Sequence, residues 1–304
     1  MEAHDHTHTH GHANDGGRGG QKNIRTAFFL NLTFTLVEIV GGMATNSVAI
    51  LSDAVHDLGD SLSLGIAWFL GRYGDKAPDR KFSYGYARFS LLGALVNSLV
   101  LVAGSAFVLS RAVPRIFHPQ EVHAAGMMAL AVLGILVNGL AAFQLNKGTS
   151  FNEKVVLWHL LEDVLGWVAI LVAGLVLLFV DIPVLDPLLS LGITLYVLYH
   201  VGINLKQILH ILLQGVPAHF SLEAVEEEIG KVPGVLSVHH VHLWSLEGEK
   251  AMLSAHVVVA DGSGIREMGR IKGEIRKRMD GQGIGHVTIE VDFESEECGN
   301  RDCR

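Results

Sequence analysis

The sequence predicts an α-helical membrane bundle of six transmembrane helices, followed by a C-terminal α+β domain that faces the cytosol. Of the 304 residues, 49% are hydrophobic, and the mean hydropathy is +0.36. This is too apolar for an ordinary soluble domain. Several apolar runs reach about 20 residues, the length that crosses a bilayer. Ionisable residues are sparse over 89–213 and dense over 221–304, which separates a membrane domain from a water-facing one.

Residues 1–20 are predicted to be a disordered tail, because they are polar, rich in glycine and without apolar clusters. This tail carries alternating histidines, His4, His6, His8, His10 and His12. Such tracts bind transition metals loosely. The alternative is a solvated tail or a purification remnant. The polar N-terminus also predicts that there is no cleavable signal peptide.

Six apolar runs then define a transmembrane domain over residues 21–214. The short Asn46–Ser47 connection predicts that the first two spans form a hairpin. The expected spans are about 24–45, 47–71, 84–113, 121–145, 153–180 and 185–213.

Positive charge predicts the orientation of this bundle, because Lys and Arg concentrate on the cytoplasmic side of a membrane protein. The outer connections offer only Arg111 and Arg115, so both termini are expected in the cytosol. The basic residues on the opposite side are Arg18, Lys22, Arg25, Arg72, Lys76, Arg80, Lys81, Arg88, Lys147 and Lys154.

The second and fifth spans each contain the pattern His-x-x-x-Asp, as His56 with Asp60 and His159 with Asp163. Residues four apart share a helix face. At 1.5 Å per residue, His56 lies about 14 Å and Asp163 about 15 Å into their spans, near the middle of the membrane. Two imidazoles and two carboxylates at one point make a tetrahedral site for a divalent metal, most naturally Zn²⁺.

Such a site suits exchange of metal for protons. Zn²⁺ with two carboxylates and two neutral imidazoles has no net charge, so the low-dielectric interior tolerates it. Metal and protons compete for the same lone pairs, because ligands must be deprotonated to bind metal. With access alternating between the two sides, this competition gives antiport. Asp57 and Glu162 lie beside the ligands but off their face, and are candidates for proton relay, as is Glu38 in the first span.

Three other interpretations remain open at this point. The ion can be Cd²⁺, Co²⁺ or Mn²⁺ instead of Zn²⁺. The site can belong to an intramembrane metalloenzyme, although a catalytic zinc usually keeps one position open for water. It can also belong to a passive metal channel or to a sensor with a vestigial pore. The net charge of −8 argues against a nucleic-acid partner.

The domain over residues 215–296 is predicted to be an open sheet with helices on one face. Its elements, in order, are a helix over Leu222–Gly230, strands over Val235–Leu246 and Ala251–Val259, a helix over Gly264–Met279 and a strand over His286–Phe293. Strand alternation predicts that His240 and His242 share one face while His239 lies on the other. The density of metal-binding residue types predicts a metal role for His239, His240, His242, His256, His286, Glu290 and Asp292. A tail over residues 297–304 holds Cys298 and Cys303, which are as suited to a metal as to a disulfide.

The chain resembles the cation diffusion facilitators, a family of divalent-metal/proton antiporters that act mainly on zinc. The resemblance covers nearly the whole chain after about residue 24. It rests on the motifs NSVAILSDAVHDLGD, FSYGYARFSLLGALVNS, WHLLEDVLG, DPLLS, VHHVHLWSL and LSAHVVV. It implies six spans, a ferredoxin-like cytosolic domain, a homodimer, and a transport site made of His56, Asp60, His159 and Asp163.

The resemblance carries the family's cytosolic metal sites over only in part. A site that bridges the dimer would match His239, His256 and Asp292, with Glu290 where some members have His. A second site would match Cys298 and Cys303, joined by His242 or His286. A loop site found in some members would fall on Asp79, Phe82 and Tyr86, so we expect it to be absent here.

Together these observations predict a homodimeric antiporter that exports Zn²⁺ from the cytosol, with Zn²⁺ both as substrate and as a structural ion. The expected location is a bacterial inner membrane.

Overall fold

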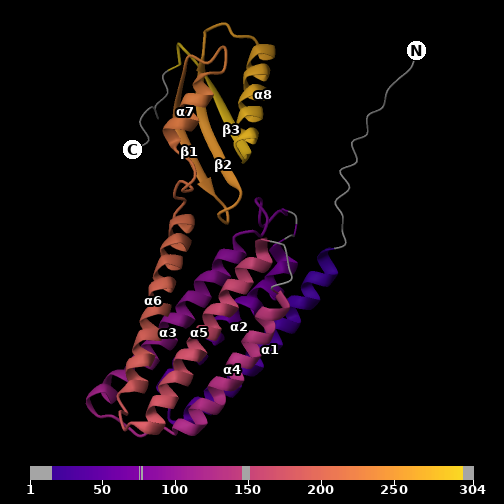
Figure 1. Ribbon diagram of the computed structural model, residues 1–304. Coiled ribbons are helices and arrows are strands. Elements are labelled where there is room, and N and C mark those ends of the chain that lie inside the picture. Colours follow the sequence, from indigo (N-terminus) through magenta and orange to yellow (C-terminus); the bar gives the residue numbers. More distant parts are fainter. Residues whose placement is uncertain (1–15, 75, 77, 146–150, 297–304) are drawn as a thin grey trace. The chain divides into compact units, whose positions relative to one another are not determined.

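The computed structural model describes residues 16–74, 76, 78–145 and 151–296, apart from some side chains near helix ends. The His-rich tract His4–His12 and the cysteines Cys298 and Cys303 lie outside the described residues. Within them the chain forms six long helices, then three strands with two shorter helices (Figure 1). The long helices are α1 (Gly16–Thr45), α2 (Val48–Gly74), α3 (Phe89–Phe117), α4 (Ala124–Leu145), α5 (Phe151–Phe179) and α6 (Leu185–Leu212).

Five of these helices, α1 and α3–α6, contain segments long and apolar enough to cross a membrane. Helix α2 differs because it carries Asp53, Asp57 and Asp60 within about two turns. Asp53 and Asp57 are nevertheless only 6% and 5% exposed. The acidic residues of α2 therefore face the inside of the bundle, as ionisable residues of membrane helices generally do.

Two predicted boundaries are wrong. Residues 16–20, assigned to the disordered tail, are helical and begin α1. Helix extension from the neighbouring apolar segment needs no new nucleus, which offsets the low helix propensity of the glycines there. The third span was expected from residue 84 but begins at Phe89. The preceding residues form a turn in which Gly85 has a φ of 79°, which no helix allows.

Helices α4 and α5 pack closely around the buried indole of Trp167. A Cβ atom on Gly134 of α4 would lie 2.3 Å from that ring, so only glycine permits this approach. Small residues at close helix contacts are typical of membrane bundles, where packing replaces the hydrophobic effect. Many large apolar side chains of the bundle point outward and are exposed, among them Leu136, Phe143, Leu165 and Phe179.

The N-terminus of α2 is capped by a residue from α6. The buried carboxylate of Asp186 accepts hydrogen bonds from Ser47 Oγ at 2.5 Å, Val48 N at 2.8 Å and Ala49 N at 3.3 Å. Ser47 in turn accepts a hydrogen bond from the Ile50 amide at 3.2 Å. The free amides that begin a helix are thus satisfied across the bundle.

The C-terminal sheet has the strand order β1-β2-β3, with β1 (Ser237–Ser245) antiparallel and β3 (Ile284–Phe293) parallel to the central strand β2 (Ala251–Val259). Helices α7 (Leu222–Gly230) and α8 (Ile265–Gly281) complete the predicted order of helix, two strands, helix and strand. Residues from α7, α8 and all three strands form one core, including Val225, Ile229, Ile271, Leu253 and Val257. The other face of the sheet carries the histidines.

The predicted alternation of His239, His240 and His242 is wrong because β1 contains a bulge. His239 pairs with His256 and His242 pairs with Ser254, so two residues of β1 oppose the single residue between them on β2. His240 within the bulge has a φ of 51°. The extra residue brings His239 to the same face as His242, away from the helices.

The chain divides into two compact units, which we describe separately. One contains residues up to Arg72 together with Val96–Val201, and the other contains Tyr73–Leu95 and Gly202–Arg304. The connection between α2 and α3 thus belongs to the same unit as the C-terminal sheet.

Candidate metal sites

The first candidate site lies inside the helical bundle and is centred on His56 of α2. The Nε2 atom of His56 lies 3.7 Å from Asp60 Oδ2 on the same helix and 3.8 Å from Asp163 Oδ1 on α5. The structure therefore brings three of the four predicted ligands together, from two helices far apart in the sequence.

The fourth predicted ligand, His159, is on α5 one turn before Asp163, but its side chain lies outside the described residues. Because positions four apart on a helix share a face, its backbone position is on the same face of α5 as Asp163.

A cavity of about 460 Å³ opens beside this site between α2, α5 and α6. His56 and Asp163 line it from one side, and the α6 residues Gly192 and Tyr196 from another. The walls are mostly apolar, and the acidic and histidine side chains among them are Asp53, His56, Glu162 and Asp163.

Asp53 also lines this cavity, and the sequence analysis did not consider it. It lies three residues before His56, so helical spacing alone would have placed it on the same face. Glu162, which the sequence places beside the ligands, lines the cavity as well.

Polar groups of α1 support the inner face of α2. Asn31 Nδ2 donates to the Asp57 carbonyl oxygen and to Ser61 Oγ, both at 3.1 Å. Glu38 is fully buried and interacts electrostatically with Asp57. These contacts place the two candidates for proton relay from α1 and α2 next to each other.

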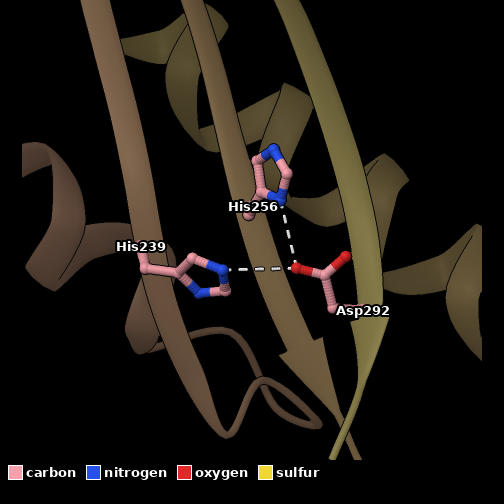
Figure 2. A group of neighbouring side chains, drawn as sticks. All are labelled: His239, His256 and Asp292. Carbon is pink, nitrogen blue, oxygen red and sulfur yellow. Dashed lines mark hydrogen bonds and ion pairs between the residues drawn. The ribbon is translucent and has the colours of Figure 1, made fainter. Parts of the chain in front are cut away.

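The second candidate site is on the open face of the C-terminal sheet, and Figure 2 shows its three side chains converging from β1, β2 and β3. Asp292 Oδ2 lies 3.3 Å from His239 Nε2 and 3.1 Å from His256 Nδ1. One ligand atom from each residue lies within 4.8 Å of the others, the geometry required to hold one metal ion. Two imidazoles and a carboxylate are ligands that Zn²⁺ accepts.

Glu290, the predicted fourth member of this group, lies near His256, at the ring nitrogen that does not face Asp292. Its Oε2 atom lies 3.3 Å from His256 Nε2. His256 therefore lies between two carboxylates, with each ring nitrogen directed at one of them.

The second cytosolic site stays a prediction, because Cys298 and Cys303 lie outside the described residues. His242 on β1 and His286 on β3 are separated by β2, and the ring of His286 instead contacts Tyr84 at a centroid distance of 5.7 Å. His242 Nε2 lies 3.3 Å from His240 Nε2. Partial burial, together with the neighbouring His240 and His256, lowers the pKa of His242 below its usual value.

The loop between α2 and α3 uses Asp79 as a hydrogen-bond acceptor. Asp79 Oδ1 accepts from the amides of Lys81 and Phe82, both at 2.8 Å, and Oδ2 accepts from the Tyr86 hydroxyl at 2.7 Å. Asp79, Phe82 and Tyr86, where the family resemblance would place a loop site, are thus joined in one hydrogen-bonded turn.

Membrane-capable helices, an ionisable group facing a cavity inside them, and a separate domain with clustered metal ligands define a membrane transporter of metal cations. The cation efflux transmembrane domain family matches residues 24–213, and the cytoplasmic domain of cation efflux proteins matches residues 217–294. The chain belongs to the cation efflux family, and it is a multi-pass membrane transporter rather than an enzyme.

Several bacterial proteins are similar to this chain over nearly their whole length. The zinc transporter ZitB of Pectobacterium atrosepticum is 33% identical, covering 91% of this chain and 87% of that protein. The cadmium, cobalt and zinc/H(+)-K(+) antiporter of Bacillus velezensis is 32% identical, covering 92% and 90%. The metal cation efflux system protein CzcD of Cupriavidus metallidurans is 34% identical, covering 95% and 92%.

Among solved structures, the metal-bound C-terminal domain of the CzcD transporter is 38% identical to this chain. It covers 24% of this chain and 99% of that domain, with a TM-score of 0.22.

Proposed function

We propose that this protein exports Zn²⁺ from the cytosol in exchange for protons, by alternating access at a site made of His56, Asp60, His159 and Asp163. The observation that carries this proposal is the position of His56 Nε2, 3.7 Å from Asp60 and 3.8 Å from Asp163.

These distances fit a site ready to close on a metal ion. Ligands at about 2.0–2.1 Å from a tetrahedral Zn²⁺ lie about 3.3–3.4 Å apart. His56 and its two carboxylates therefore need to approach by only about 0.4 Å each. His159, one turn from Asp163, supplies the second nitrogen.

The exchange follows from the charges of the site. With Zn²⁺ bound, two carboxylates balance the ion and its desolvation is offset. When the ion leaves, the carboxylates and imidazoles take up protons, because the lone pairs that held the metal become available. Each cycle then carries metal one way and protons the other. Glu38 and Asp57 are the relay groups.

The cavity beside His56 and Asp163 supports a route for the ion. Asp53 lies in its wall one turn from His56 and offers a carboxylate to a cation on that route. The apolar remainder of the wall keeps the ion dependent on these few groups.

Zinc is the ion we favour, because two imidazole nitrogens suit Zn²⁺ better than hard cations such as Mg²⁺ or Ca²⁺. Two of the three bacterial relatives have zinc in their names, one of these also names cadmium and cobalt, and the third names metal cations in general. Cd²⁺ and Co²⁺ are therefore the secondary substrates to test.

The proposal includes the architecture around the site. Helix α2 brings the number of membrane spans to six, and its aspartate side chains face the inside of the bundle. The transmembrane domain covers residues 21–214 and the cytosolic, ferredoxin-like domain 215–296, with both termini in the cytosol of a bacterial cell. The working form is a homodimer in the inner membrane. His239, His256 and Asp292, with Glu290, bind a structural Zn²⁺ between or within its cytosolic domains.

Zinc flux in proteoliposomes tests the proposal. In the wild type, an imposed pH gradient should drive Zn²⁺ in the direction opposite to the proton flow. Asp163→Ala should abolish this flux, while the variant elutes at the wild-type size in size-exclusion chromatography. Asp181→Ala is the matched control, because it removes an exposed carboxylate from the connection between α5 and α6. Retained flux in Asp163→Ala would show that Asp163 is not part of the transport site. Zinc movement unaffected by the pH gradient would indicate a channel instead.

A further inference from the structure

The bulge in β1 places an unusual histidine on the open face of the sheet. His240 has a φ of 51°, in the left-handed region. A residue other than glycine in this region costs roughly 1 kcal/mol. Such a conformation persists only where the surrounding structure imposes it, and it often marks a functional position.

The consequence of this backbone conformation is a cluster of imidazole rings. The ring of His240 contacts the His242 ring at a centroid distance of 4.5 Å and the His256 ring at 5.0 Å, in both cases nearly perpendicular. The Nε2 atoms of His240 and His242 lie 3.3 Å apart. The two Nε2 atoms are therefore directed toward each other across the face of the strand, and either one can donate the hydrogen bond between them.

The 3.3 Å separation of the two Nε2 atoms also matches the spacing of two ligands on one metal ion. Two nitrogen ligands at about 2.0–2.1 Å from a tetrahedral Zn²⁺ lie about 3.3–3.4 Å apart. The pair already has the spacing that a shared ion would impose.

The pair is separate from the group in Figure 2. The two ring nitrogens of His256 are directed at Asp292 and Glu290, and His239 Nε2 is directed at Asp292. Among the described residues, neither His240 nor His242 joins a cluster of three ligands. The sheet therefore carries a carboxylate-containing group and, beside it, a pair of imidazoles.

We propose that His240 and His242 form a second metal site, which binds a divalent d-block cation such as Zn²⁺ through both Nε2 atoms. Water completes its coordination. With two protein ligands, neither of them charged, this site binds at least about tenfold more weakly than the three-ligand group. It holds a readily exchanged ion directly beside the tightly held one.

Zinc binding to the metal-stripped, full-length protein in detergent tests this site. The number of ions bound is measured by equilibrium dialysis at graded free Zn²⁺, with Co²⁺ absorption as a second readout of imidazole ligation. His240→Asn and His242→Asn should each lose the same weakly held ion, and the double variant should lose no more. Asparagine suits position 240 because it tolerates the left-handed conformation.

Two further variants separate this site from its neighbours. Asp292→Asn should lose the tightly held ion and keep the weak one. His219→Asn is the matched control, because it removes an exposed histidine from the connection before α7. Undiminished weak binding in His242→Asn, whose backbone lies in a regular part of β1, would overturn the proposal. So would loss of the weak ion in Asp292→Asn, since it would make the two sites one. Neither result depends on whether the protein transports zinc.

Discussion

The Nε2 atom of His56 lies 3.8 Å from the Oδ1 atom of Asp163, across the space between α2 and α5. This contact joins two His-x-x-x-Asp patterns that are about a hundred positions apart in the sequence. It converts two local spacings into one candidate binding site. The identity of the ion and the stability of the site can each be tested by changing one of its parts.

The choice of metal should depend on the imidazole at position 56. His56→Asp replaces a nitrogen ligand by oxygen and makes the site more anionic, so discrimination in favour of Zn²⁺ should weaken. We expect a severalfold rise in the ratio of Cd²⁺ to Zn²⁺ transport. Competition between the two ions in proteoliposomes measures this ratio. His200→Asp, which changes a histidine on α6 outside the residues that line the cavity, is the control. An unchanged ratio in His56→Asp would count against nitrogen ligation by His56.

The position of α2 should depend on Asp186. Asp186→Ala removes the acceptor for the Ser47 hydroxyl and for two amides at the start of α2. Leaving these buried donors unpaired costs about 1–3 kcal/mol. We expect the melting temperature in detergent to fall by several degrees, and transport to fall with it because α2 carries His56. Asp186→Asn, which keeps one acceptor oxygen, should fall less. Equal melting temperatures for wild type and Asp186→Ala would show that the cap does not stabilise the bundle.

The loop between α2 and α3 should stay folded at low pH, because hydrogen bonds stabilise the ionised carboxylate of Asp79. The hydrogen bond from Tyr86, followed by those from the Phe82 and Lys81 amides, lowers the pKa of Asp79 to about 2 from an ordinary value of 3.8. Since the folded pKa is the lower one, the stabilisation is fully present above about pH 4 and is lost as the pH falls through about 2.

Titration of ¹³C-labelled aspartate carboxyl groups by NMR checks this value, and Asp79→Asn assigns the signal. Tyr86→Phe should raise the pKa of Asp79 toward its usual range. Tyr84→Phe, which removes a hydroxyl from the same loop but leaves the Tyr86, Phe82 and Lys81 donors to Asp79 in place, should leave the pKa low. A normal pKa for Asp79 in the wild type would mean that the turn is open in solution.

The His-rich tail should affect zinc capture but not the transport step. Deleting residues 1–15 removes the five alternating histidines and leaves α1 complete from Gly16. We expect a higher zinc concentration at half-maximal flux and the same flux at saturating zinc. A variant with the same histidines changed to serine separates charge and metal binding from tail length. An inactive transporter would show instead that the tail takes part in the cycle.

Much of this architecture could be predicted from the sequence because its signals are local. Apolar length defined the long helices, and residue alternation gave the order of the C-terminal elements. The failures were also local in origin. The turn at Gly85 delays the start of α3 beyond the point that hydropathy indicated. The bulge at His240 interrupts the side-chain alternation, which assumes a regular strand.

The sequence by itself determined which residues are candidate ligands, since helical spacing places His56 with Asp60, and His159 with Asp163, on common faces. Only the tertiary structure decided which of these faces meet. Long-range packing brought His56 to Asp163 and placed Asp186 at the start of α2. It also gathered His239, His256 and Asp292 from three strands. Such contacts depend on how distant segments pack, and no periodicity along the chain encodes them.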